Sequence, residues 1–273
     1  MTPSGFGRVV VATANMRDHK VTCMMMVNKS ESCVCVDSVQ SALSAVHGGA
    51  DRLEVCGNLG VGGGTTPSFG LVRAIQKAVP HVPIMAMVRP RTGDFLYSKE
   101  ELDVMLEDIE IFKNAGIAGV VFGVLNLDGT ADVLRTMTLV EAALPMQVCF
   151  HRALDMTRSA IEAFDQISMI PGITRVLTSG QSISVSAGIH VLQELFQRSQ
   201  RRQGPAILPG GGINPETIEV HLSGGRWVDG GMVHRPESMG MGASVEGEWA
   251  VWLTNGSAIR EVRSIIDGLA SSS

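Results

Sequence analysis

Phe150-His151-Arg152-Ala153-Leu154-Asp155 ends a short apolar run with an imidazole, a guanidinium and a carboxylate. Other short apolar runs also stop at polar residues or glycine, at Arg52-Leu53-Glu54-Val55-Cys56, Arg89-Pro90-Arg91, Val176-Leu177-Thr178-Ser179-Gly180 and Pro209-Gly210-Gly211-Gly212. Proteins with parallel strands and intervening helices keep their ligand sites at the carboxyl ends of the strands. The stretch therefore predicts a parallel α/β fold with its site at the strand ends.

Short β-branched runs alternate with helical patterns from Cys33 onward, which is typical of repeated βα units. The candidate strands span residues 33–36, 53–56, 84–88, 120–122, 147–150, 175–177, 206–208 and 219–221. Eight parallel strands close a TIM (β/α)8 barrel. We expect one such barrel domain over residues 32–270, preceded by a poorly ordered tail over residues 1–31.

Several helix ends can be predicted from local signals. Ser98, followed three residues later by Glu101, is typical of a capping box, and the pair Thr66-Pro67 is typical of an N-cap with proline at the first helical position. Apolar residues at helical spacing between residues 259 and 269 predict a closing helix that covers an edge of the barrel.

The interval between the seventh and eighth predicted strands is short. A parallel crossover needs about a dozen residues, and fewer are available between Gly211 and Ile218. We therefore expect the helix between these strands to be shortened or missing after Thr217.

The bulk composition excludes several classes of protein. The 273 residues, 45% of them hydrophobic, are enough for one large core. A net charge of -5 without a long basic run predicts no nucleic-acid partner and no anionic membrane partner. No apolar run approaches the roughly 18 residues of a membrane helix. Five cysteines, mostly in strand-like runs, favour reduced thiols in the cytoplasm; presence in the nucleus stays open.

Strand alternation places thiols on one face of the first two predicted strands. Cys33 and Cys35 share a face of the first strand, and Glu54 and Cys56 share a face of the second. Because adjacent strands lie about 4.8 Å apart, we expect Cys35 and Cys56 to face each other near the barrel mouth. Thiolates are soft ligands that favour Cu(I) or zinc. The spacing matches no zinc-finger signature, so buried cysteines acting as small hydrophobes stay the alternative.

The charged residues at the strand ends indicate a different chemistry. Glu54, His151 and Asp155 are candidates for general acid–base catalysis. The alternative is an ion network that fills the barrel mouth without turnover. Its members would be Arg52, Glu54, Arg89 and Asp155.

Arginines and glycines at the same strand ends are suited to a small anion. Arginine clamps carboxylates and phosphates through paired hydrogen bonds, and the glycine loop after the seventh strand is where many barrels hold phosphate. By itself a triple glycine is a weak signal. The candidate anion-binding residues are Arg52, Arg89, Arg91, Arg152, Ser179, Gly180, Gly210, Gly211 and Gly212.

Several of these motifs in series resemble the CutC copper homeostasis family. They are Cys35-Val36-Asp37-Ser38, the run from Gly48 to Cys56, the run from Gly63 to Ser68, the run from Arg89 to Ser98, Phe150-His151-Arg152-Ala153, Leu177-Thr178-Ser179-Gly180 and Pro209-Gly210-Gly211-Gly212. The resemblance covers roughly residues 33–266, and Met241-Gly242-Ala243-Ser244 is similar to eukaryotic members. It implies a TIM barrel, usually a homo-oligomer, that handles copper in the cytoplasm.

The resemblance also implies metal ligands. Cys35 and Cys56 match the cysteines linked to copper binding in animal members. Where the family usually has a glutamate two residues before the first-strand cysteine, this chain has Cys33, which replaces a carboxylate by a thiol on the same face. Cys33 is therefore a third candidate ligand.

Two functions stay open at this point. The first is copper homeostasis through Cu(I) bound by Cys35 and Cys56, with zinc as a second candidate metal. The second is a barrel enzyme of unknown reaction that acts on a small anionic phosphate or carboxylate substrate. Whether the chain catalyses any reaction is left open.

Overall fold

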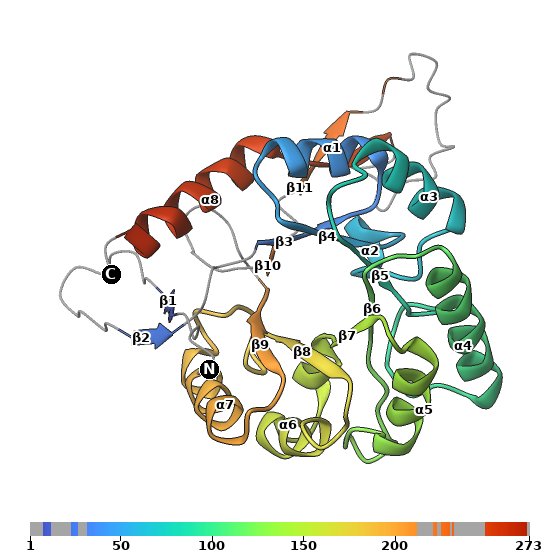
Figure 1. Cartoon of the computed structure of the whole chain (residues 1–273), viewed down its shortest axis with the longest axis vertical. Helices are drawn as coiled ribbons and strands as arrows, with labels where there is room; N and C mark the ends of the chain where they lie inside the picture. Colours follow the sequence, from blue (N-terminus) through green and yellow to red (C-terminus); the bar gives the residue numbers. More distant parts are fainter. Residues whose placement is uncertain are drawn as a thin grey trace, which may run out of the picture.

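The fold is a curled parallel sheet surrounded by helices, and the computed structural model describes residues 8–11, 23–26, 32–211, 221–222, 225–229, 231 and 249–271 of the chain. Eight parallel strands follow the order β10-β3-β4-β5-β6-β7-β8-β9 around a common centre (Figure 1). They are β3 (Cys33–Val36), β4 (Arg52–Val55), β5 (Ile84–Met87), β6 (Gly119–Phe122), β7 (Gln147–Phe150), β8 (Ile173–Thr178), β9 (Ala206–Pro209) and β10 (His221–Leu222). The predicted TIM-type barrel is confirmed.

Helices connect the strands and cover the outside of the sheet (Figure 1). They are α1 (Val39–His47), α2 (Leu59–Gly62), α3 (Phe69–Ala78), α4 (Lys99–Asn114), α5 (Val133–Ala143), the 3-10 helix η1 (Arg152–Met156), α6 (Ala160–Ile167), α7 (Ile189–Arg202) and α8 (Gly256–Ser271).

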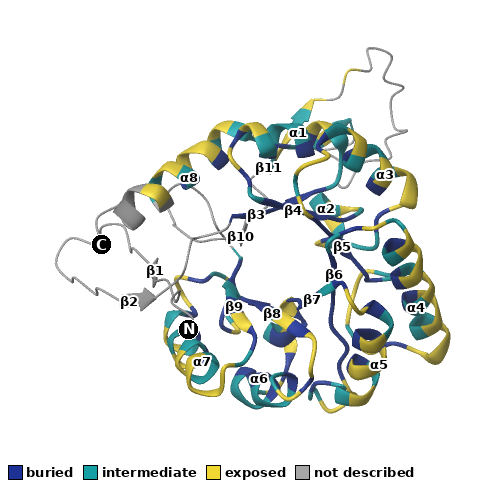
Figure 2. Cartoon of the chain, viewed as in Figure 1, coloured by how far each residue is buried: buried dark blue, intermediate teal, exposed yellow. Residues whose placement is uncertain are grey.

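Alternation along the strands divides the apolar residues of the sheet into two clusters. Outward-facing residues such as Leu53, Phe122 and Phe150 are fully buried against the helices in the larger cluster. Inward-facing residues such as Met85 and Cys149 form a smaller cluster inside the barrel. Figure 2 shows the buried strands at the centre and the exposed outer sides of the helices. The outer cluster is thus the main hydrophobic core.

Seven predicted strands appear within two residues of their predicted ends. The eighth, predicted at residues 219–221, appears as β10, where His221 lies opposite Cys33 of β3. β9 and β10 stand at the two ends of the strand order over the described residues. The connection between them, with Thr217 and the predicted missing helix, falls in residues 212–220 and lies outside that part of the chain.

The capping box predicted for α4 is confirmed. The Ser98 hydroxyl accepts a hydrogen bond from the Glu101 N–H at 3.2 Å, and the Glu101 carboxylate accepts one from the Ser98 N–H at 2.8 Å. These two bonds satisfy backbone donors that the first turn of a helix otherwise leaves unpaired.

The cap predicted at Thr66-Pro67 is wrong. Helix α3 is capped by Ser68, whose hydroxyl accepts from the Leu71 N–H at 3.2 Å. Thr66 instead donates its N–H to the Arg89 carbonyl and accepts from the Arg89 N–H on its hydroxyl, both at 2.9 Å. Because both groups of Thr66 are bound to Arg89, two residues after the end of β5, the helix begins later.

The predicted closing helix is confirmed as α8, which packs against α1. Gly48 ends α1, and a Cβ atom there would lie 2.6 Å from the Cβ of Ile259. Glycine at this position therefore lets α8 approach α1 closely.

Two antiparallel strand pairs lie outside the barrel and were not predicted. β1 (Arg8–Val11) pairs with β2 (Cys23–Met26), inside the segment predicted to be a tail. β11 (Gly225–Asp229) pairs with β12 (Ala250–Thr254), and the rings of Trp227 and Trp252 meet edge to face at 5.4 Å. The domain boundary at residue 32 stays a prediction.

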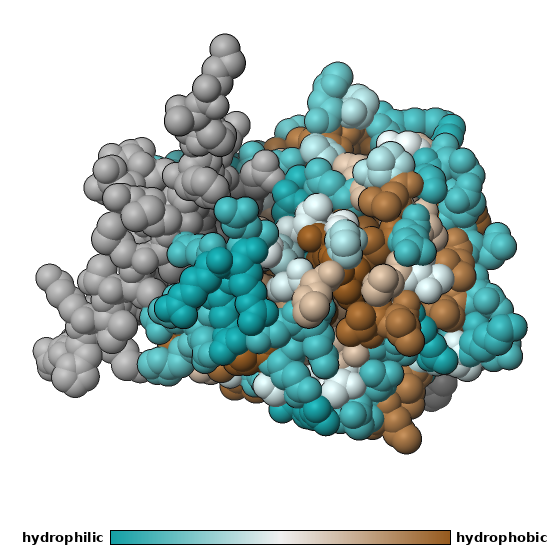
Figure 3. Space-filling model, turned by 60° about the horizontal axis from the view of Figure 1, so that its bottom comes forward, coloured by the Kyte–Doolittle hydropathy of each residue, from teal (hydrophilic) through white to brown (hydrophobic). Residues whose placement is uncertain are grey.

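The outer surface combines hydrophilic and hydrophobic side chains (Figure 3). Individual apolar residues such as Ile183 and Met169 are 94% and 81% exposed. No helix within the described ranges is long and apolar enough to cross a membrane. The predicted homo-oligomer stays a prediction.

Candidate functional site

The register between β3 and β4 sets which residues lie side by side in the barrel interior. Cys33 lies opposite Arg52, and Cys35 lies opposite Glu54. Arg52 and Glu54 are only 8% and 2% exposed. Both residues belong to β4, so their charged side chains lie within the barrel.

The two candidate thiols are buried neighbours on one face. The Cys35 thiol donates a hydrogen bond to the Glu54 carboxylate at 3.4 Å, and the Cys56 thiol donates to the Val36 carbonyl at 3.7 Å. Burial raises the pKa of both thiols well above its usual value, and the charge of Glu54 adds to the rise. The charge of Cys35 also raises the pKa of Cys56, so the two groups interact electrostatically.

Sulfur atoms from further strands line the same interior. Cys56, Met85, Met87 and Cys149 pack together in the inner cluster. Cys33, Cys35, Cys56 and Cys149 are all buried and free of disulfides. The alternation in the run Ile84-Met85-Ala86-Met87 places both methionines on the inward face of β5.

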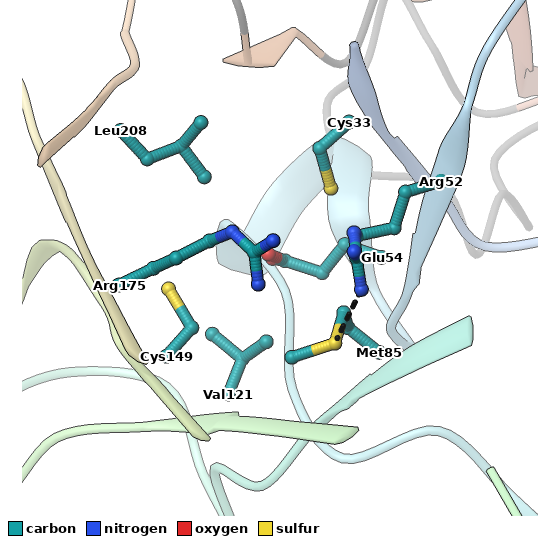
Figure 4. Close-up of a pocket in the computed structure, with 8 residues that line it drawn as sticks. All are labelled: Cys33, Arg52, Glu54, Met85, Val121, Cys149, Arg175 and Leu208. Atoms are coloured by element: carbon teal, nitrogen blue, oxygen red, sulfur yellow. Dashed lines mark hydrogen bonds between the residues drawn. The ribbon is translucent and has the colours of Figure 1, made fainter. Parts of the chain in front are cut away.

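A small cavity of about 30 Å³ lies among these side chains (Figure 4). Its lining residues are Cys33, Arg52, Glu54, Met85, Val121, Cys149, Arg175 and Leu208. The lining therefore combines sulfur atoms, which are soft metal ligands, with charged guanidinium and carboxylate groups.

The guanidinium groups of Arg52 and Arg175 are held inside the barrel by Gln147. Its side-chain carbonyl accepts hydrogen bonds from Arg52 at 3.1 Å and from Arg175 at 2.7 Å. Arg52 also donates to the sulfur of Met85 at 3.4 Å. In Figure 4 the Glu54 carboxylate points toward the Arg175 guanidinium. Gln147 and Arg175 were missed as site residues, although both occupy inward positions of predicted strands.

The guanidinium groups of Arg89 and Arg91 are bound to backbone carbonyls and carboxylates around them. Arg89 is 8% exposed and donates to the carbonyls of Gly62 at 2.7 Å, Gly64 at 2.9 Å and Gly93 at 3.0 Å. Arg91 forms ion pairs with the carboxylates of Glu101 and Asp94. Both guanidinium groups thus already have partners within the protein, and their predicted role in binding an anion stays a prediction.

Asp155 connects the ends of β7 and β8. Its carboxylate accepts hydrogen bonds from the Arg152 side chain at 2.8 Å, from the Ser179 N–H at 3.0 Å and from the Gln181 N–H at 3.1 Å. The hydroxyl of Thr178 also donates to it. Through these hydrogen bonds, Asp155 holds the loop after β8 in place.

Most of the predicted anion-binding backbone groups are already bonded. The Gly180 N–H donates to the Thr178 hydroxyl at 2.9 Å, and the Gly210 N–H donates to the Thr178 carbonyl at 3.0 Å. Gly211 has a φ of 125°, and a Cβ atom there would lie 3.1 Å from a terminal nitrogen of Arg152. Gly212 lies outside the described residues.

His151 presents a polar atom without a protein partner at the barrel mouth. Its Nδ1 accepts the Ala153 N–H at 3.2 Å, which leaves Nε2 to carry the proton of the neutral ring. Nε2 is buried, and no hydrogen-bond partner is found for it within the described ranges. Burial, with a contribution from the charge of Arg89, lowers the pKa of His151 to about 4. A neutral ring of this tautomer is a hydrogen-bond donor.

The fold and the interior define a TIM-type barrel whose core carries thiols and charged groups as well as apolar residues. The chain belongs to the CutC family, whose sequence profile matches residues 30–230.

Named relatives and a solved structure agree with this assignment. The human "Copper homeostasis protein cutC homolog" is 39% identical over 243 residues, which cover 85% of this chain and 87% of the human protein. The homologue of the same name from Dictyostelium discoideum is 39% identical over 248 residues, covering 78% of this chain and 88% of that protein. The crystal structure of CutC from Streptococcus agalactiae superimposes with a TM-score of 0.63 at 26% identity, covering 70% of this chain and 96% of the other.

Proposed function

We propose that this protein acts in copper homeostasis by binding Cu(I) inside its barrel through Cys35 and Cys56. Support comes from the family, whose human and Dictyostelium members carry copper homeostasis in their names. The observation that carries the proposal is the sulfur lining: every cysteine between residues 32 and 211 is buried and unoxidised, and Met85 and Met87 lie beside them. Soft sulfur ligands favour Cu(I) over hard cations.

The donor set fits Cu(I) better than it fits zinc. Structural zinc takes four ligands in almost all cases. Among the described residues, no group of three or more His, Cys, Asp or Glu side chains is arranged to hold a metal ion. Cu(I) accepts two thiolates, so Cys35 and Cys56 are sufficient. Cys33 lies two residues before Cys35 in β3.

Deprotonation accompanies this binding. Since burial raises the pKa of both thiols, the metal-free site holds them as neutral SH groups near neutral pH. Metal binding displaces the protons, so the apparent Cu(I) affinity increases with pH. The neighbouring Glu54 carboxylate opposes deprotonation because like charges repel.

An anaerobic Cu(I) titration against a competing chelator tests the proposal. We expect wild type to bind Cu(I) tightly and Cys35→Ala with Cys56→Ala to lose that binding. Cys149→Ala is the matched control, because it removes another buried thiol from the same interior. Equal affinity and stoichiometry in wild type and the double variant would exclude this site, and Cys33→Ala measures the contribution of the third thiol.

His151 favours a second candidate function, binding of a small phosphate or carboxylate at the barrel mouth. Its buried Nε2–H is available to a ligand oxygen, and Arg152 is the next residue in the chain. Thermal shifts with inorganic phosphate and small carboxylates test this function. Shifts that are present in wild type and lost in His151→Phe support it, whereas no shift in wild type counts against it. A chemical reaction at this place would then be sought with the ligand that binds.

A further inference from the structure

The loop after β4 lies directly against the Cys56 thiol. Cys56 follows the last residue of β4 and is fully buried. A Cβ atom at Gly64 would lie 3.4 Å from the Cys56 sulfur and 3.6 Å from the terminal carbon of Met87. Leu59 of α2 packs against the same inner cluster. Residues 57–65 therefore cover the thiol, and we call them the Cys56 cover.

The Cys56 cover is a closed loop between two regular elements. At its ends, Gly57 and Thr65 exchange two backbone hydrogen bonds, each 2.8 Å long. Its tip consists of the short helix α2 and of Gly63 and Gly64, which have φ values of 67° and 91°. Because the cover lies outside β4 and α3, its tip can open without breaking either element.

Arg89 fastens the tip of the cover. Its Nη1 donates hydrogen bonds to the carbonyls of Gly62 at 2.7 Å and Gly64 at 2.9 Å, and its Nη2 donates to the Gly93 carbonyl of the next loop at 3.0 Å. The guanidinium also lies 5.1 Å from the centre of the Phe95 ring. Hydrogen bonds from a charged donor are stronger than neutral ones, and a buried guanidinium that loses its partners is costly. Arg89 therefore joins the cover to the loop after β5.

We infer that Arg89 is a positioning residue that holds the Cys56 cover closed, so that the cover opens before a soft metal ion or a thiol reagent reaches Cys56. For copper, the inference rests on the proposed function, whereas for the accessibility of the thiol it stands by itself. Native proteins open locally at a lower free-energy cost than global unfolding. Loss of the bonds to Gly62 and Gly64 should therefore raise the open fraction of the cover by about tenfold or more.

Alkylation of the metal-free protein by iodoacetamide under native conditions tests the inference, with the rate at each cysteine measured by peptide mass spectrometry. The thiolate is the nucleophile, so a buried neutral thiol reacts only when it becomes exposed. The reaction forms a sulfur–carbon bond and releases iodide and the thiol proton. We expect Arg89→Met to raise the rate at Cys56 by about tenfold or more. The rate at Cys33 should stay nearly unchanged, because Cys33 lies at the other end of the strands, opposite Arg52.

The ratio of the two rates separates opening of the cover from unfolding, because unfolding exposes both thiols together. Arg135→Met is the matched control, since it removes another arginine that donates to a loop carbonyl, that of Tyr97 at 2.7 Å. Arg89→Lys keeps the charge with fewer donors and should give a smaller rise at Cys56. An unchanged ratio in both Arg89 variants, an equal rise at both thiols, or the same rise in Arg135→Met overturns the inference.

Transfer of Cu(I) to and from a competing chelator, followed by stopped flow, tests the part that concerns copper. We expect both transfer rates to be higher in Arg89→Met than in wild type, and equal rates overturn this part. Failure of wild type to bind Cu(I), or binding that survives in the double cysteine variant, overturns the proposed function. The alkylation result then still decides whether Arg89 holds the cover closed.

Discussion

The outward and inward faces of the same seven strands, β3 to β9, have opposite characters. Outward residues such as Leu53, Phe122 and Phe150 are apolar, fully buried and packed against helices. Inward residues include thiols and charged side chains. Among them, Cys35 donates a hydrogen bond to Glu54. The outer face buries apolar area, which is the main favourable contribution to folding. The inner face carries groups that are costly to bury, which is a feature of functional sites.

The largest loss of stability should come from a substitution on the outward face of the sheet. Phe122→Ala removes a fully buried ring from the main core and should lower the free energy of unfolding by about 3–5 kcal/mol. Denaturant unfolding measures it, and Cu(I) affinity per folded molecule should change little. A loss of under about 1 kcal/mol would show that the outer face does not dominate stability.

Acidification should lower the stability of the folded protein through His151, on the inward side of the sheet. The pKa of His151 is about 4 in the folded protein, below the usual value near 6.5 in the unfolded chain. The unfolded state therefore binds more protons between these pH values, and stability falls as the pH decreases from about 6.5 to 4, by about 3 kcal/mol in total.

Urea unfolding at a series of pH values measures this effect. His151→Gln should lose its part of the pH dependence, and replacement of the exposed His81 by Gln is the matched control. The same slope in wild type and His151→Gln would mean that other groups cause the acid sensitivity.

The smallest stability effect should come from a volume-conserving change inside the barrel. Met87→Leu keeps an apolar side chain of similar size in the inner cluster and should change the free energy of unfolding by less than about 1.5 kcal/mol. Thermal unfolding measures it. A larger loss than in Phe122→Ala would reverse the contrast between the two faces.

The elements of the outer layer were predictable because their signals are local. The α4 capping box needs only Ser98 and Glu101, and the strand pattern needs only alternating short apolar runs and helical segments. The start of α3 was not predictable in this way. Thr66 has the residue type of a cap, but its partner is Arg89, two residues after the neighbouring strand β5.

The candidate site was only partly predictable. Strand alternation predicted that Cys35, Glu54 and Cys56 lie on the same side of the sheet. How deep a residue lies in the barrel depends on the register between strands. Arg175 and Gln147 meet Arg52 across the barrel, far away in sequence. Whether Cys35 and Cys56 bind metal stays a prediction, as does the role of the charged residues at the mouth.

The sequence by itself determined the class of fold and the order of its strands, because helix caps and strand alternation act over a few residues. The family followed from the series of motifs along the chain. Only the tertiary structure decided where the guanidinium groups point. Arg89 binds the loop carbonyls of Gly62 and Gly64, whereas Arg52 binds Gln147 inside the barrel. A buried charged group takes the partners that the surrounding fold supplies, because leaving it unpaired is costly.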